Sequence, residues 1–157
     1  MLDFALLDRV FNAIANSISF LETVEKRAVI RSLRIIYFYP DELLHELNTL
    51  IKTNGADPDT AIAKGSKILE RREDIDAALS FITSASVTTN LKLSLELVEE
   101  LRQIADFKSG IRGTLNGIFF TWMFERNREE VVELAIVARN DIQYLNSKIQ
   151  ALEKMLQ

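Results

Sequence analysis

Residues 131–156, VVELAIVARNDIQYLNSKIQALEKML, decide the fold class of this chain. Apolar side chains recur along this stretch at alternating steps of four and three residues, which keeps one face of an α-helix apolar. The positions are Val131, Ala135, Ala138, Ile142, Leu145, Ile149, Leu152 and Leu156. The pattern predicts a long C-terminal helix with coiled-coil-like spacing.

A similar rhythm predicts a long helix at the other end of the sequence. Steps of three and four separate Phe4, Leu7, Phe11, Ile14, Ile18 and Leu21. The rhythm continues more loosely to Ile36, and Pro40 blocks further extension because proline cannot continue a helix. We therefore expect one helix from about Asp3 to Phe38, whose weakest point is the charged stretch Glu25–Arg27.

The centre of the sequence carries start and stop signals for further helices. Pro40–Glu42 combines a proline with acidic side chains that suit the first turn of a helix. Asn54-Gly55 is a stop signal, and Asp57 is an expected N-cap for the helical pattern that ends at Ile82. Each of these signals is local, so each predicts a boundary without reference to the rest of the chain.

The remaining segments complete an all-helical organisation. Residues 84–90 are expected to form a connection and a cap, and a fourth apolar face runs from Leu93 to Ile104. Alternating strand patterns are absent, and the chain has only two prolines. We predict an all-α fold in a single domain over residues 1–157, arranged as an antiparallel bundle of about five or six helices with long N- and C-terminal helices.

Composition narrows the classes of function. The net charge of −4 argues against a general nucleic-acid binder, because such proteins present basic surfaces. The absence of cysteine excludes disulfides and fits a reducing, cytoplasmic location. The first residues lack the basic region of a signal peptide, and no apolar run is long enough to cross a membrane.

The run at residues 118–124, IFFTWMF, is apolar on nearly every helical face. One interpretation buries it in the middle of the bundle. The other makes it a surface for a protein partner or for a second copy of the chain, because aromatic residues and methionine are enriched at interfaces. The candidate interface residues are Ile118, Phe119, Phe120, Trp122, Met123 and Phe124.

Three glycines precede this run, at positions 110, 113 and 117. They favour a turn between helices, or a turn that runs into a closely packed helix start, because a glycine in a helix interior costs about 1 kcal/mol relative to alanine. The alternative is a helical face from which side chains are missing, so that a neighbouring helix can approach closely.

A basic stripe is the second candidate site. Arg27, Arg31 and Arg34 share one face of the expected first helix, at spacings of four and three. Such a stripe suits an anionic partner, whereas its simplest interpretation is a solvated face paired with nearby acids.

The sequence offers little to catalysis. His45 is the only histidine, so a di-metal site with two Glu-x-x-His motifs is excluded, and no nucleotide-binding loop is present. We identify no catalytic, cofactor-binding or metal-ligating residues and expect no cofactor. The favoured function is a non-enzymatic interaction module that self-associates as an accessory, regulatory or inhibitory subunit. The alternatives are a membrane-active effector that uses the amphipathic N-terminal helix, and a carboxylate-based metal enzyme.

Overall fold

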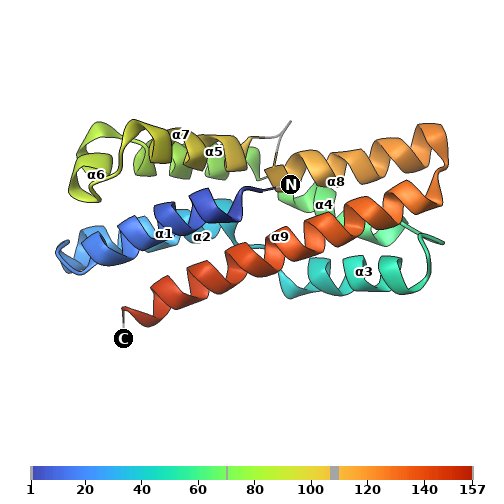
Figure 1. The fold of residues 1–157 in the computed structure, drawn as a ribbon, viewed down its shortest axis with the longest axis horizontal. Coiled ribbons are helices and arrows are strands. Elements are labelled where there is room, and N and C mark those ends of the chain that lie inside the picture. The colour runs from blue at the N-terminus through green and yellow to red at the C-terminus, as the bar shows by residue number, and fades with distance from the viewer. Residues whose placement is uncertain (1, 70, 107–109, 157) are drawn as a thin grey trace. The chain divides into compact units, whose positions relative to one another are not determined.

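The structure, a computed structural model, describes residues 2–69, 71–106 and 110–156. Within those ranges the chain is all-α, as predicted, and Figure 1 shows the helices in order from blue to red. Its contacts divide it into two compact units, which are described in turn. The expectation that residues 1–157 form one domain stays a prediction.

Unit 1 contains residues 39–72 and 106–144. Its α-helices are α3 (Asp41–Lys52), α4 (Asp59–Leu69), α8 (Gly110–Phe120) and the first part of α9 (Arg128–Lys154), and a short π-helix, η1 (Thr121–Glu125), follows α8 directly. Helix α4 packs against both α3 and α8.

Unit 2 contains residues 2–38, 73–105 and 145–157. Its helices are α1 (Phe4–Ile18), α2 (Thr23–Tyr37), α5 (Arg72–Ile82, of which Arg72 itself belongs to unit 1), α6 (Ala85–Asn90), α7 (Leu95–Ala105) and the last part of α9.

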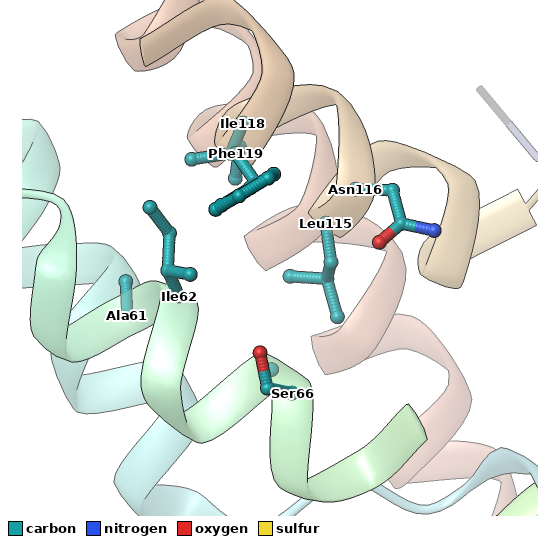
Figure 2. Close-up of a pocket in the computed structure, with 8 residues that line it drawn as sticks. Ala61, Ile62, Ser66, Leu115, Asn116, Ile118 and Phe119 are labelled. Carbon is teal, nitrogen blue, oxygen red and sulfur yellow. The ribbon is translucent and has the colours of Figure 1, made fainter. Parts of the chain in front are cut away.

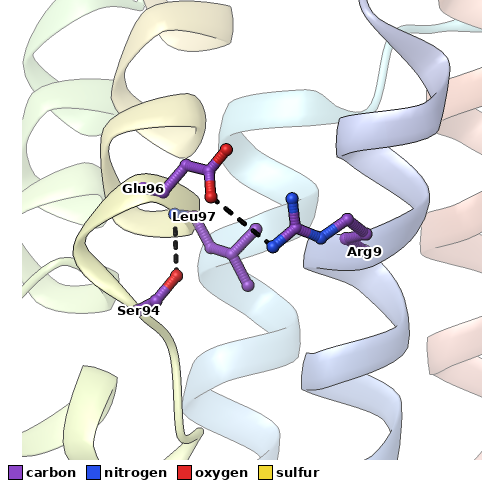
Figure 3. A network of polar contacts seen from close by, with 4 residues as sticks. All are labelled: Arg9, Ser94, Glu96 and Leu97. Carbon is purple, nitrogen blue, oxygen red and sulfur yellow. Dashed lines mark hydrogen bonds and ion pairs between the residues drawn. The ribbon is translucent and has the colours of Figure 1, made fainter.

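Helix α7 makes polar contacts with both α1 and α2, and it packs against α1 in unit 2. Arg9 and Glu96 form an exposed ion pair at 3.5 Å between the two helices. The Ser94 hydroxyl accepts a hydrogen bond from the Leu97 backbone N–H and so caps the start of α7 (Figure 3). Deeper in this unit, the buried Tyr37 hydroxyl donates to the Leu101 carbonyl at 2.6 Å. The surface pairs contribute little, so apolar burial carries most of the stability of this packing.

The predicted C-terminal helix is confirmed. Helix α9 spans 27 residues, and seven of its eight heptad positions, Val131 to Leu152, are at most 3% exposed. Leu156, the eighth, lies beyond the end of the helix and is 38% exposed.

The prediction of one long N-terminal helix is wrong. Helix α1 ends at Ile18 and α2 begins at Thr23, so the break falls earlier than the Glu25–Arg27 stretch. The extended backbone of Glu22, with ψ of 152°, ends any helical continuity, and the chain turns back there (Figure 1). Both apolar faces become buried in this way, which a straight helix from Asp3 to Phe38 would not achieve.

The predicted number of helices is also too low. Nine α-helices and one π-helix occupy the described residues, against the five or six expected. The pattern that was expected to form one helix up to Ile82 is divided into α4 and α5, and the expected connection at 84–90 contains the short helix α6. The spacing of apolar residues can continue across a short break between two helices when each helix buries an apolar face. This spacing alone therefore does not show how many helices a segment contains. None of the helices in the described ranges has the length and apolarity needed to cross a lipid bilayer.

The predicted stop at Asn54-Gly55 is confirmed in detail. Asn54 has a left-handed backbone with φ of 56°, and its N–H donates to the Ile51 carbonyl at 3.2 Å. The N–H of Gly55 donates to the Leu50 carbonyl at 2.8 Å, which completes a Schellman motif. These bonds satisfy carbonyls at the end of α3 that would otherwise lack partners.

The start of α9 is anchored on this same turn. The Arg128 side chain donates to the backbone carbonyls of Asn54 at 3.0 Å and Thr53 at 3.2 Å. Gly55 lies against α9, because a Cβ atom placed on it would be 3.1 Å from the Arg128 carbonyl oxygen. The turn therefore positions α9 beside the end of α3 within unit 1.

Gly55→Ala is expected to lower the free energy of unfolding by about 1–2 kcal/mol, because Gly55 has φ of +73° and an L-residue is strained there. The added Cβ also presses on a backbone oxygen of α9. Chemical denaturation followed by circular dichroism measures the change. Gly65→Ala is the matched control: its Cβ meets only the Leu115 side chain at 3.8 Å, so this variant should be at least as stable as the parent. Equal stability of Gly55→Ala and the parent would contradict the expectation.

Candidate interaction site

The candidate interface lies where α8 runs into η1. The backbone of η1 forms a π-helix over Thr121–Glu125, and Arg126, with φ of 53°, ends it in the left-handed region. Isolated π-helical turns are uncommon and occur frequently at functional sites. Neither the π-helix nor its position could be read from the sequence pattern.

The 118–124 run is neither wholly core nor wholly surface. Ile118 is 2% exposed and Thr121 is 6% exposed, so one face of the run packs inward. Four other side chains reach solvent, and we call them the apolar patch: Phe119 is 37% exposed, Phe120 57%, Met123 47% and Phe124 74%. The core interpretation therefore holds for one face of the run, and the interface interpretation stays a prediction for the exposed face.

The rings of the apolar patch are arranged in an ordered series. Phe119 and Phe120 meet edge to face with centroids 5.8 Å apart. Phe120 and Phe124 are stacked, with centroids 5.6 Å apart and an interplanar angle of 21°. Such pairs contribute about 0.5–1.5 kcal/mol beyond the area that they bury. The patch is therefore a preorganised surface rather than a set of separate loose side chains.

Trp122 behaves differently from its neighbours. Its indole is half-buried, and the Arg126 guanidinium lies 4.8 Å from the ring centroid, a cation–π arrangement. Of the six residues named as interface candidates, Ile118 belongs to the buried face, Trp122 to the border, and the remaining four to the apolar patch.

Carboxylates border the patch on its C-terminal side. A hydrogen bond with Glu125 raises the pKa of Glu130, and the nearby charges of Glu125 and Glu133 raise it further. Protonation is favoured because it relieves repulsion between these groups. A partner that carries acidic groups at the same place would meet the same repulsion.

A cavity of about 180 Å³ opens beside the patch between α4 and α8, and we call it the hollow. Figure 2 shows its lining side chains, which come from both helices. The lining residues are Ala61, Ile62, Gly65, Ser66, Leu115, Asn116, Ile118 and Phe119. Most of them are apolar, and Phe119 belongs to both the hollow and the patch.

Gly65 keeps the hollow open. It lies inside α4, and a Cβ placed there would meet the Leu115 side chain of α8 at 3.8 to 4.0 Å. A larger side chain at position 65 would extend into the space between the two helices. The sequence contained one signal for the hollow, which is a glycine inside a predicted helix. It did not indicate which other helix would face that glycine.

The glycines ahead of the run do not form a simple turn, and their positions agree with the second form of the favoured interpretation, a closely packed helix start. Gly110 begins α8 with φ of +69°, whereas Gly113 and Gly117 lie within the helix. A Cβ on Gly117 would be 3.4 Å from a methyl group of Leu134 on α9. Close approach of a neighbouring helix, which the closely packed helix start and the alternative interpretation both include, therefore accounts for Gly117. Residues 107–109 are outside the described ranges.

The basic stripe is exposed on α2 but is partly engaged. Arg34 forms an ion pair with Glu153 and lies 3.9 Å above the Phe38 ring. Arg27 and Arg31 are exposed, and no ion pair joins either of them to another described residue. An anion-binding role for the three arginines stays a prediction.

His45 is exposed on α3, and the described residues contain no group of three His, Asp or Glu side chains that could hold a metal ion. Comparisons of the chain with protein-family models, with curated proteins and with solved structures find no match.

Proposed function

We propose that this chain is a helical protein–protein interaction module that associates with itself through the apolar patch and serves as an accessory, regulatory or inhibitory subunit. The observation that supports the proposal is the contiguous exposure of Phe119, Phe120, Met123 and Phe124 beside the hollow. The cytoplasmic location expected from the sequence stays a prediction.

The size of the patch supports an interface. Taking about 200 Å² for each whole side chain, the four exposed fractions leave about 400 Å² of apolar surface in solvent. Patches of about 300–600 Å² are the largest that monomers usually expose, and they are often functional. Burial of this area on two copies would remove about 800 Å² of apolar surface from water, which is the main favourable contribution to association and must exceed about 4–15 kcal/mol of association cost.

The two alternative functions gain no support from the described residues. A membrane-active first helix needs an exposed apolar face, but Leu7, Val10, Phe11, Ile14 and Ile18 of α1 are buried. For a carboxylate-based metal enzyme, no observation identifies a site. We therefore propose no second function.

Self-association is tested by light scattering after size-exclusion chromatography. The parent chain is expected to show a mass above that of one chain, increasing with concentration through the micromolar range. Phe120→Asp should give the mass of one chain at every concentration, because a charge would be buried at the centre of the patch. Its stability should fall by about 1 kcal/mol or less, since Phe120 is more than half exposed.

The matched control places the same charge on another exposed apolar residue. Leu95 is 88% exposed at the start of α7, in unit 2, and Leu95→Asp should associate like the parent chain. A parent chain that remains strictly monomeric at high micromolar concentration would refute self-association.

A further inference from the structure

The apolar patch and the hollow form one continuous surface with a projection and a depression. Phe119 lines the hollow, Phe120 contacts Phe119, and Phe124 stacks on Phe120 at the other end of the series. Phe124 is the most exposed of the four patch side chains, at 74%. A largely exposed phenyl ring and an open apolar cavity thus belong to the same segment of unit 1, with Phe119 of the hollow five positions before Phe124 in the sequence.

The hollow has the size of one aromatic ring. An apolar cavity of about 150 Å³ in another protein holds a benzene molecule, and the hollow measures about 180 Å³. Its volume is below the roughly 300–1,000 Å³ of pockets for drug-sized ligands. A single phenyl group therefore fits the hollow better than a cofactor or an extended metabolite does.

We propose that the hollow receives the Phe124 ring of a second copy of this chain, and that the contact is reciprocal. This inference rests on the proposed self-association and specifies its geometry. In a two-fold symmetric pair the same surface of each copy must be complementary to itself. A surface that carries both the projecting ring and the cavity for it meets that condition.

The area of the patch agrees with one interface of this kind. A standard interface buries about 800 Å² on each partner, of which about 57% is apolar. The corresponding apolar area, about 450 Å² for each partner, is close to the roughly 400 Å² that the patch exposes. Phe120 lies between the projecting ring and the hollow, so the two-fold axis is expected to pass near it.

Two substitutions remove the two halves of the contact separately. Phe124→Ala removes the ring and leaves the hollow open. Gly65→Leu fills the hollow from inside α4 and leaves Phe124 in place; it also replaces a helical glycine by a good helix former, so the fold should be retained. Each variant alone is expected to weaken self-association by at least about 100-fold, because both symmetric contacts are lost.

Two controls separate this contact from general effects. Gly65→Ala introduces only a Cβ in ordinary contact with Leu115, so most of the hollow remains and self-association should be unchanged. Leu95→Ala removes an equally apolar and more exposed side chain from unit 2, and it should also leave self-association unchanged. Thermal unfolding of each variant, followed by circular dichroism, verifies that all of them are folded.

Mixing the two weakened variants is the decisive measurement. The Gly65→Leu chain retains the ring and the Phe124→Ala chain retains an open hollow, so a mixed pair regains one of the two contacts. With one chain labelled, sedimentation velocity should show a mixed species at concentrations where each variant alone is monomeric. The expected result is that the parent chain self-associates, that each variant alone is monomeric, and that the mixture of the two variants forms a pair.

Other outcomes overturn the proposal in distinguishable ways. If both variants associate like the parent chain, the ring and the hollow do not meet, although self-association stands. If the variants are monomeric and the mixture stays monomeric, the reciprocal geometry is wrong. If the parent chain itself is monomeric, both the reciprocal contact and the proposed self-association fail.

Discussion

Ile118→Asp unfolds this chain or severely destabilises it, whereas the same change at Phe120, two residues later, leaves the fold in place. Ile118 is 2% exposed on the inward face of α8. An aspartate there would place a negative charge in a buried position that the fold uses for an apolar side chain. We expect a loss of at least about 3 kcal/mol, which is a large share of the roughly 5–15 kcal/mol that stabilises a typical domain.

Chemical denaturation and limited proteolysis of the two aspartate variants measure this difference. The expected result is a large shift of the unfolding midpoint for Ile118→Asp and a small one for Phe120→Asp. Similar stabilities for the two variants would show that the division of the run into a buried face and an exposed face is wrong.

Ile142→Ala is expected to lower the free energy of unfolding by about 2–5 kcal/mol. Ile142 is fully buried on α9, and truncation removes apolar contacts and leaves a cavity that the surrounding helices fill only partly. The matched control is Ile136→Ala on the same helix, where the side chain is only half-buried and the cost should be clearly smaller. Equal losses at positions 136 and 142 would contradict the assignment of the heptad face to the core.

Features that depend on a few consecutive residues could be predicted from the sequence. The long helix α9 could be predicted because its apolar positions repeat at helical spacing. The stop at Asn54-Gly55 could be predicted because it depends only on residues at the end of α3. The all-α class could be predicted because many such local patterns along the chain each indicate a helix.

Features that depend on contacts between distant segments could not be predicted in this way. The turn after Ile18 lets α1 and α2 each bury an apolar face. The spacing of apolar residues continues across this turn, so the sequence pattern did not reveal it. The hollow exists because Gly65 faces Leu115, fifty positions later, and no local pattern pairs these two residues. The 118–124 run has apolar side chains on all faces, so only the packing of α8 could decide which of them remain in solvent.

The π-helix η1 has a consequence for how this surface can vary. A π-helical turn closes its hydrogen bonds over one residue more than an α-helical turn does, so it accommodates a single-residue insertion without unwinding the helix around it. Ile118 lies in the α-helical part before η1, whereas Met123 and Phe124 lie inside the wide turn itself. A length change of one residue within η1 would therefore redirect Met123 and Phe124, while the inward-facing residues of α8 kept their register. The same helix could thus acquire or lose a binding specificity through one codon, separately from the residues that maintain its fold.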